Sequence, residues 1–314
     1  MRGNKNNFAE VAVEVATYVT QSFLKLLEDS KEQLSSCNLK VPLILTTLEP
    51  FFQSKFESMN LPPLSTMETL DLDSSLLPYF TLMYISIYLI GYSTLFKKWD
   101  PKKRADASSC LISLTHGTPA AFLSIYANFL HPHKPDNHFA AQNTPFQAMV
   151  LDFSIAYFLI DTLHYLTFIP NDYLFIAHHL AVLYVFITCR YVVCYGAYPI
   201  LLLLALAEVT SLCQNTWSLA RCQKDEVTAA ARLYGGLSPY FYGFYTVVRG
   251  VLGPLLVYKM MVFYLNGGGD GVVPVWIWCS WMVVIVNAIL LSVLWVSNLW
   301  FEFFKERSKI RKLS

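Results

Sequence analysis

Residues 161–179 read DTLHYLTFIPNDYLFIAHH and lie between two long apolar runs. One aspartate and three histidines therefore stand in or beside segments whose other residues suit lipid, where ionisable groups are costly and usually mark function. A short polar turn with one proline, residues 170–172, separates the two runs. The stretch predicts a helical hairpin that carries Asp161 in its first helix and the pair His178 and His179 at the start of its second.

The composition of the whole chain is typical of a membrane protein. Of its 314 residues, 55% are hydrophobic and only 14% are charged. The net charge of +1 gives no bulk field that would attract nucleic acid, so we expect an integral membrane protein without a nucleic-acid partner. The seven cysteines show no repeated CxxC spacing, which argues against a disulfide framework and against a zinc site. We therefore expect no bound metal and no bound cofactor.

Seven apolar segments are long enough to cross a bilayer, which takes about 20 residues. They predict an all-α, multi-pass transmembrane bundle of about seven spans. Its transmembrane domain, residues 78–305, would follow an N-terminal region, 1–77, and precede a basic tail, 306–314. The predicted spans are residues 78–96, 107–130, 146–169, 173–193, 197–221, 238–265 and 274–303.

The N-terminal region begins with an amphipathic pattern. Apolar residues recur at helical spacing through residues 7–34, with glutamate and lysine between them. Such a helix either lies on a membrane surface or packs on the rest of the protein. Its insertion into the bilayer would instead raise the number of spans to eight.

Lysine and arginine gather in three places that fall on one side of a seven-span bundle: the first connection, the fifth connection and the C-terminal tail. The positive-inside rule places this side in the cytosol, so we expect a cytosolic C-terminus and a lumenal N-terminus. The last four residues, RKLS, resemble a dilysine retrieval signal of the endoplasmic reticulum, with arginine in place of one lysine. They also fit a simple basic tail beside the membrane.

Polar residues of five predicted spans reach a similar depth. At about 1.5 Å of helical rise per residue, they lie between about 8 and 20 Å from the cytosolic edge. Scattered structural residues would not need to share a depth, so the convergence favours one water-accessible cavity that opens toward the cytosol. The residues concerned are His116, Asp161, His178, His179, Glu208, Asn215 and Arg249.

Residues near the predicted hairpin turn also have structural interpretations. Asp161 and His164 are three residues apart on one helix face, so they either satisfy each other or serve a function. The adjacent His178 and His179 point about 100° apart. One of them can therefore face the cavity while the other binds a neighbouring backbone group.

A second set of polar residues lies on the fifth and sixth predicted spans. Glu208 and Asn215 are seven residues apart and share a helix face. Arg249 is the candidate partner that keeps Glu208 ionised in a medium of low dielectric constant. This triad is either structural or part of a binding site.

The order and spacing of these residues resemble the TLC family, membrane proteins named after translocating-chain-associated proteins, longevity-assurance ceramide synthases and a neuronal ceroid lipofuscinosis protein. The resemblance covers approximately residues 78–305. It is carried by His116, by Asp161 followed by His178 and His179, by Glu208-x6-Asn215 in EVTSLCQN, and by Arg249 in YTVVR.

In ceramide synthases of this family, the histidine pair and aspartates serve acyl transfer from acyl-coenzyme A to a sphingoid amine. The resemblance implies that His178 or His179 is a general base or accepts the acyl group, and that Asp161 orients the imidazole. It implies a membrane lipid as ligand and acyl-coenzyme A as co-substrate. The candidate substrate-binding residues are His116, His164, Glu208, Asn215 and Arg249.

The sequence departs from the ceramide synthases in two places. No His-Asp-x-x-Asp-x-x-x-Leu-Glu run follows the histidine pair, only ALAE at residues 205–208, and the N-terminal part has no homeobox-like basic helix. The Glu-x6-Asn pattern resembles a TLC-domain branch whose members are tied to membrane lipid composition rather than to one reaction.

Two functions therefore compete. The first is an enzyme that transfers an acyl group to or from a membrane lipid, which predicts a histidine nitrogen within hydrogen-bond reach of Asp161 and facing a tunnel long enough for an acyl chain. The second is a non-catalytic protein that binds, senses or carries a lipid. A di-iron lipid hydroxylase would need several histidine boxes, and the chain has seven histidines with a single adjacent pair. A transporter would be supported by an internal repeat, and none is evident.

Overall fold

The computed structural model of the chain describes residues 75–130 and 139–313, without the side chains of Lys102 and residues 306–313. The described residues form helices and their connections, in two compact units. The larger unit contains Asp71–Asn215 and Ser238–Ser314, and the described part of the smaller one is Thr216–Leu237. The amphipathic helix predicted at residues 7–34 lies outside the described residues.

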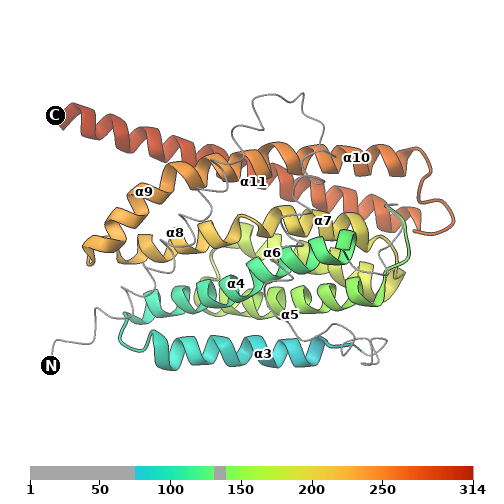
Figure 1. Cartoon of the computed structure of the whole chain (residues 1–314), viewed down its shortest axis with the longest axis horizontal. Helices are drawn as coiled ribbons and strands as arrows, with labels where there is room; N and C mark the ends of the chain where they lie inside the picture. Colours follow the sequence, from blue (N-terminus) through green and yellow to red (C-terminus); the bar gives the residue numbers. More distant parts are fainter. Residues whose placement is uncertain (1–74, 131–138, 314) are drawn as a thin grey trace. The chain divides into compact units, whose positions relative to one another are not determined.

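Several helices continue as π-helical segments, in which each hydrogen bond spans five residues instead of four (Figure 1). The α-helices are α3 (Leu77–Ile90), α4 (Pro101–Ile125), α5 (Pro145–Phe168), α6 (Tyr173–Ile187), α7 (Ala197–Glu208), α8 (Ser211–Gln223), α9 (Thr228–Tyr245), α10 (Gly253–Leu265) and α11 (Val275–Leu313). The π-helical segments are Gly91–Leu95, Tyr126–Leu130, Thr188–Val193 and Thr246–Leu252.

The central helix of the larger unit is α5. It packs against α3, α4, α6 and α7, and Figure 1 shows it running alongside α3 and α4. In its most apolar stretch 89% of the residues are buried, against at most 56% in the other membrane-length helices. The buried polar side chains of α5, among them Asp152 and Asp161, therefore face protein groups and not lipid.

Local signals in the sequence explain where the α5–α6 hairpin begins and turns. A capping box starts α5: the Thr144 side chain accepts from the Gln147 backbone N–H, and the Gln147 side chain accepts from the Thr144 N–H. The Asp172 carboxylate then caps α6 by accepting from the Phe175 N–H at 3.2 Å. The predicted hairpin is confirmed.

Six described helices are long and apolar enough to cross a membrane, and they correspond to the second through seventh predicted spans. The first predicted span, residues 78–96, is not among these six. It forms α3 and the π-helical segment that follows it, and it packs against α5 and α4. The six are Lys103–Leu130, Pro145–Phe168, Tyr173–Val193, Ala197–Gln223, Thr228–Leu265 and Val275–Lys305.

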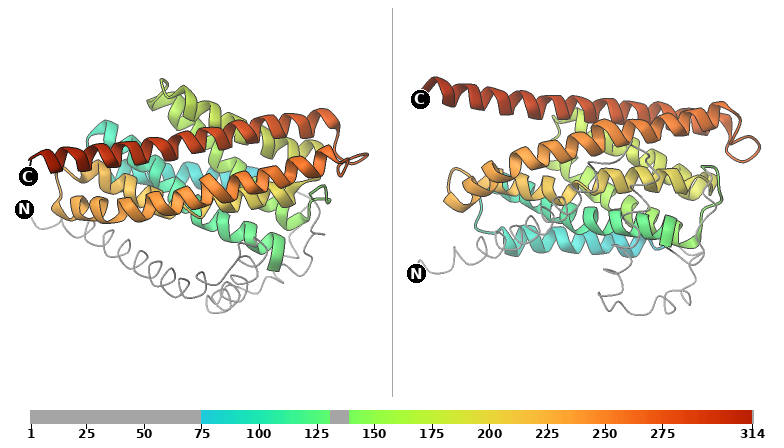
Figure 2. Two further views of the ribbon diagram at one scale, coloured as in Figure 1. Left: turned by 90° about the horizontal axis from the view of Figure 1, so that it is seen from above. Right: turned by 45° about the horizontal axis from the view of Figure 1, so that its top comes forward.

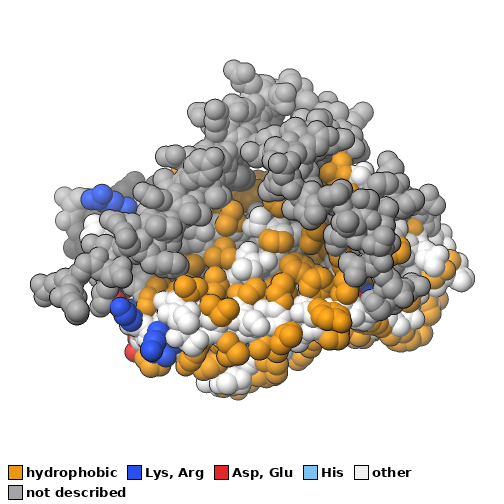
Figure 3. All heavy atoms as spheres, turned by 60° about the horizontal axis from the view of Figure 1, so that its bottom comes forward, with side chains coloured by type: hydrophobic (Ala, Val, Ile, Leu, Met, Phe, Trp, Pro, Cys, Tyr) orange, Lys and Arg blue, Asp and Glu red, His pale blue; other side chains and the backbone are white. Residues whose placement is uncertain are grey.

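The outer surface of the larger unit suits a lipid environment. Large apolar side chains such as Leu82, Leu89 and Tyr258 point outward. Where the face in Figure 3 is not covered by grey atoms, most of the coloured side chains are hydrophobic and few are charged. A contiguous apolar surface of this kind is expected of a protein embedded in a bilayer.

The last two helices of the larger unit lie side by side. Figure 2 shows α10 next to α11, and α11 also packs against α6. The helix α11 is 39 residues long and continues through residues 306–313 of the predicted basic tail.

The smaller unit has its own aromatic and basic contacts. The ring of Trp217 packs against that of Tyr234, with 5.2 Å between centroids. Two cations lie over these rings: Lys224 over Tyr234 at 4.5 Å and Arg221 over Trp217 at 5.4 Å. Aromatic faces attract such cations, so part of the positive charge of the predicted fifth connection stabilises this unit.

Candidate functional site

The α5–α6 hairpin brings Asp161 and His179 into contact. Asp161 lies near the end of α5, and His179 lies in the second turn of α6. The Nε2 atom of His179 is 2.9 Å from the Oδ2 atom of Asp161, and the two side chains are only 3% and 2% exposed. The short polar turn between the helices makes this contact possible because it places the end of α5 beside the start of α6.

Asp161 has two further donors in addition to His179. The Ser109 hydroxyl of α4 donates to Oδ1 at 2.6 Å, and the Tyr157 hydroxyl donates to Oδ2 at 3.3 Å. His164, which the sequence offers as an alternative partner, is instead 2.9 Å from the Tyr88 hydroxyl of α3 through Nδ1. The buried carboxylate is thus satisfied by groups from three helices, as a charge in this position must be.

Both ring nitrogens of His179 are occupied by acceptors. Its Nε2 faces the Asp161 carboxylate, and its Nδ1 is 3.1 Å from the carbonyl oxygen of Phe175. A carbonyl and an ionised carboxylate can only accept, so with Asp161 ionised both bonds form together only when both nitrogens carry protons. In that state His179 and Asp161 form a buried ion pair, and His179 keeps no lone pair for a substrate.

His178 faces a different neighbour. Its ring packs edge-on against Trp295 of α11, with centroids 5.8 Å apart, and lies at 74° to the ring of His179. The Nδ1 atom of His178 is buried and has no hydrogen-bond partner in the described chain. The two histidines therefore have different surroundings, as the 100° offset predicts. His179 binds Asp161 and a backbone group, whereas the Nδ1 atom of His178 has no partner in the described chain.

His116 and Glu208 meet where α4 crosses the end of α7. The Nε2 atom of His116 is 3.1 Å from the Ser154 hydroxyl, and its Nδ1 atom is 3.9 Å from Oε1 of Glu208. The other carboxylate oxygen of Glu208 accepts from the Ser211 hydroxyl. Gly117 permits this approach, because a Cβ atom there would lie 2.7 Å from Glu208 Oε2 and 2.5 Å from the Ser211 Cβ.

The fifth predicted span is broken between α7 and α8, and Arg249 donates a hydrogen bond to the backbone at this break. The carbonyl oxygen of Ala207 accepts from Arg249 Nη2 at 2.6 Å and from the Thr210 hydroxyl at 3.1 Å. Non-helical backbone at membrane depth needs such donors. The expected Arg249–Glu208 ion pair is absent from the ion pairs of the described residues, because the guanidinium binds the carbonyl that precedes Glu208 in the chain.

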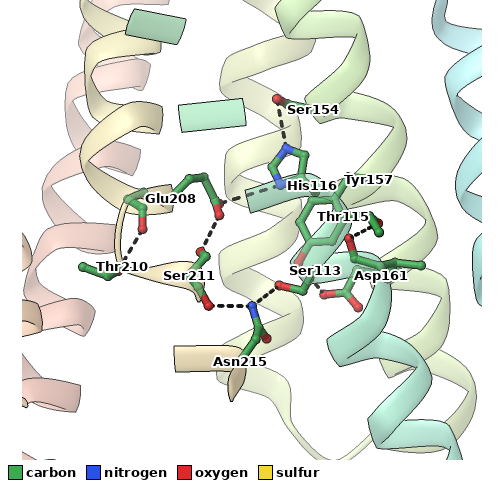
Figure 4. A network of polar contacts seen from close by, with 12 residues as sticks. Ser113, Thr115, His116, Ser154, Tyr157, Asp161, Glu208, Thr210, Ser211 and Asn215 are labelled. Carbon is green, nitrogen blue, oxygen red and sulfur yellow. Dashed lines mark hydrogen bonds and ion pairs between the residues drawn. The ribbon is translucent and has the colours of Figure 1, made fainter. Parts of the chain in front are cut away.

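Asn215 extends the same network by one turn of α8. Its side-chain amide donates to the Ser113 hydroxyl and to the Ser211 carbonyl, each at 2.9 Å. Glu208 and Asn215 thus lie on one side, as the seven-residue spacing predicts, and the structure shows that this side faces α4. Figure 4 shows the two side chains joined through Ser211.

Tyr157 connects this network to Asp161. Its ring stacks on that of His116 with centroids 4.0 Å apart, while its hydroxyl donates to the Asp161 carboxylate (Figure 4). We call the connected set the polar core. Its members are Ser109, Ser113, His116, Ser154, Tyr157, Asp161, His179, Glu208, Ser211 and Asn215. No three His, Cys, Asp or Glu side chains in the described ranges are grouped so that they could hold a metal ion.

The sequence interpretation missed a second buried carboxylate on α5. Asp152 is 1% exposed, and its Oδ1 accepts from Arg190 Nε at 3.2 Å and from the Tyr191 hydroxyl at 2.6 Å. Its Oδ2 accepts from the Leu76 backbone N–H at 3.0 Å. The signal was available, because Asp152 is an aspartate inside a predicted span. This cluster fastens α5 to the end of the fourth span and to the start of α3.

Comparison with known proteins agrees with this architecture. Residues 106–300 match the TLC domain, a range that contains all eight candidate site residues and begins after α3. The chain is 54% identical over 239 residues to a TLC domain-containing protein of Arabidopsis thaliana, and the alignment covers 75% of this chain and 93% of that protein. No solved structure matches the chain.

Proposed function

The chain belongs to the TLC-domain family of multi-pass membrane proteins, and from this membership and the polar core we propose that it transfers an acyl group to or from a membrane lipid. The observation that carries the proposal is the division of the histidine pair. Asp161 holds His179 at 2.9 Å, while the neighbouring His178 has a ring nitrogen that no described group occupies.

A free imidazole nitrogen supplies the chemistry that acyl transfer needs. In the proposed reaction, acyl-coenzyme A donates the acyl group, and a hydroxyl or amine of the lipid attacks the thioester carbonyl. His178 removes the proton from the attacking group as the new bond forms. The carbon–sulfur bond then breaks, and the proton passes to the departing thiolate. His178 alternatively accepts the acyl group on its nitrogen before the lipid attacks.

In this mechanism Asp161 and His179 are positioning residues. Their ion pair fixes the first turns of α6, and with them the direction in which His178 points. His116, Glu208 and Asn215 are the candidates for holding the polar part of the lipid.

The proposal is tested by lipid profiling of cells that express the native chain or His178→Phe at equal protein levels. Phenylalanine retains a ring to pack against Trp295 and removes both nitrogens. The control is Tyr258→Phe, a change of similar size on an outward-facing residue of α10. We expect one lipid class to accumulate with the native chain and the control but not with His178→Phe, and to form when purified protein receives acyl-coenzyme A. Equal profiles for all three folded proteins would contradict acyl transfer.

One observation favours a second candidate, a lipid-binding protein without a reaction. The Asp161 carboxylate and both nitrogens of His179 are already bonded to protein groups, which suits a rigid binding scaffold. In that case a photoreactive lipid would cross-link to the native chain and to His178→Phe equally, and the lipid profile would not change.

We further propose residence in the endoplasmic reticulum, with a cytosolic C-terminus and a lumenal N-terminus. The distribution of lysine and arginine among the connections supports this orientation. Chemical labelling of a single exposed cysteine, described below, tests the orientation.

A further inference from the structure

Two fully buried polar atoms, one of them 3.9 Å from the Glu208 carboxylate and the other on a ring that contacts the same histidine, lack a hydrogen-bond partner in the described chain. They are the Tyr84 hydroxyl on α3 and the Nδ1 atom of His116 on α4. Both residues are 0% exposed, and Glu208 at the end of α7 is 8% exposed. Three helices thus bring three polar side chains to one place inside the larger unit without pairing all of their polar atoms.

The position of the Tyr84 hydroxyl is fixed by the packing of its ring. That ring contacts Phe153, Tyr157 and His116, with centroids 5.5, 5.9 and 6.3 Å away. Because the oxygen lies at the tip of a ring held on several sides, it cannot swing away to find another partner. The His116 ring that Tyr84 contacts is the one whose Nδ1 atom lies 3.9 Å from the Glu208 carboxylate, so the two side chains lie beside the same histidine.

The hydroxyl of Tyr84 is not needed for packing. Phenylalanine would keep the ring contacts and remove a buried polar group that costs free energy when it is unpaired. Buried polar groups in folded proteins are almost always paired, and an orphaned one calls for an explanation. A bound group that completes these hydrogen bonds is such an explanation.

The geometry selects the chemistry of that group. The 3.9 Å between His116 Nδ1 and Glu208 Oε1 is too long for a direct hydrogen bond, but one oxygen atom can lie within reach of both. A group that both donates and accepts can bond to the carboxylate and to the Tyr84 hydroxyl whichever way that O–H points. A hydroxyl does both, whereas an ammonium group only donates and an ester carbonyl only accepts.

We infer that Tyr84, His116 and Glu208 form a binding site for a hydroxyl group of the membrane lipid on which the protein acts. The inference rests on the proposed function for the nature of the ligand, and it adds α3, which lies outside the matched TLC domain, to the substrate site.

The test uses the full chain in phosphatidylcholine nanodiscs and two probes that differ in one group, oleyl alcohol and oleyl methyl ether. Each probe competes with a photoreactive long-chain alcohol for cross-linking to the protein. We expect the native chain to prefer the alcohol about tenfold, the effect of one or two hydrogen bonds, and Tyr84→Phe to lose that preference. The matched control is Tyr79→Phe, the same chemical change at a 72% exposed position of α3, which keeps the preference.

A second variant, Glu208→Gln, removes the charge at nearly constant volume and is expected to weaken the preference as well. An unchanged preference in Tyr84→Phe, or none in the native chain, overturns the inference. If Tyr84→Phe lowers the unfolding temperature but keeps the preference, the hydroxyl binds an internal water only, which also overturns it.

The outcome is separable from that of the acyl-transfer proposal. If His178→Phe abolishes product formation while Tyr84→Phe retains the alcohol preference, acyl transfer stands and the hydroxyl site fails. If neither the native chain nor His178→Phe forms product but the preference for the alcohol depends on Tyr84, the hydroxyl site stands without the reaction.

Discussion

Replacing His179 by alanine would strand a carboxylate in the centre of the bundle. Asp161 would keep only two neutral donors, the hydroxyls of Ser109 at 2.6 Å and Tyr157 at 3.3 Å. Removing one partner of a buried ion pair typically costs about 3–5 kcal/mol, and the two remaining donors place this case near about 3 kcal/mol. The neighbouring His178→Ala breaks no ion pair and removes ring contacts with Trp295 and Phe175, each worth about 0.5–1.5 kcal/mol.

The two variants share the same helix and the same residue type, so each controls for the other. Their free energies of unfolding can be measured by tryptophan fluorescence in mixed detergent micelles. The double variant His179→Ala with Asp161→Asn removes the stranded charge, and we expect it to be more stable than the sum of the single changes by about 0.5–3 kcal/mol. Equal losses for His179→Ala and His178→Ala, or strict additivity in the double variant, would refute the ion-pair assignment.

Three further changes test the fold. Gly117→Ala places a Cβ atom 2.5 Å from a side-chain carbon of α8 and should destabilise the protein by about 1–3 kcal/mol. In Gly243→Ala the new Cβ atom meets nothing within 4 Å, so this variant should be neutral or stabilised by up to about 1 kcal/mol. The same unfolding assay compares the two variants. Arg190→Ala leaves Asp152 with the Tyr191 hydroxyl and the Leu76 N–H as donors and should cost about 3 kcal/mol, with partial recovery when Asp152→Asn is added. Cys194, exposed between α6 and α7, should react with an impermeant maleimide only after microsomes are opened, in a chain whose other cysteines are alanine; reaction in sealed microsomes would contradict the proposed orientation.

The membrane helices could be predicted because a span must be long and apolar whatever surrounds it. The division between the fourth and fifth predicted spans is marked in the structure by two residues with positive φ, Cys194 at 61° and Gly196 at 85°. The central position of α5 could not be predicted. An apolar side chain that faces lipid and one that faces another helix have the same hydropathy, so the pattern does not say which helix is enclosed.

The candidate site shows a similar limit. The approach of Asp161 to a histidine of the pair follows from the hairpin, but which histidine it meets depends on side-chain direction. Arg249 shows that charge alone is a poor guide, because the guanidinium binds a carbonyl at the broken fifth span and not the Glu208 carboxylate. Tyr84 gave no signal at all, since an aromatic residue in an apolar run is indistinguishable from ordinary core.

The buried charges of the α5–α6 hairpin come in two pairs that together specify its register. Asp152 and Asp161 are separated by nine residues of α5, or about 13 Å, and Arg190 and His179 by eleven residues of the antiparallel partner, or about 16 Å. Both pairs form at once, at 3.2 and 2.9 Å.

If α6 shifted by one residue along α5, the side chains of Arg190 and His179 would turn by about 100°. Both ion pairs would then break in a buried, low-dielectric setting. Ion pairs of this kind add little net stability but penalise alternative arrangements strongly. The same register that joins His179 to Asp161 turns His178 toward α11. The distant Asp152–Arg190 pair therefore helps to set the direction of the one histidine of the pair whose ring nitrogen is free.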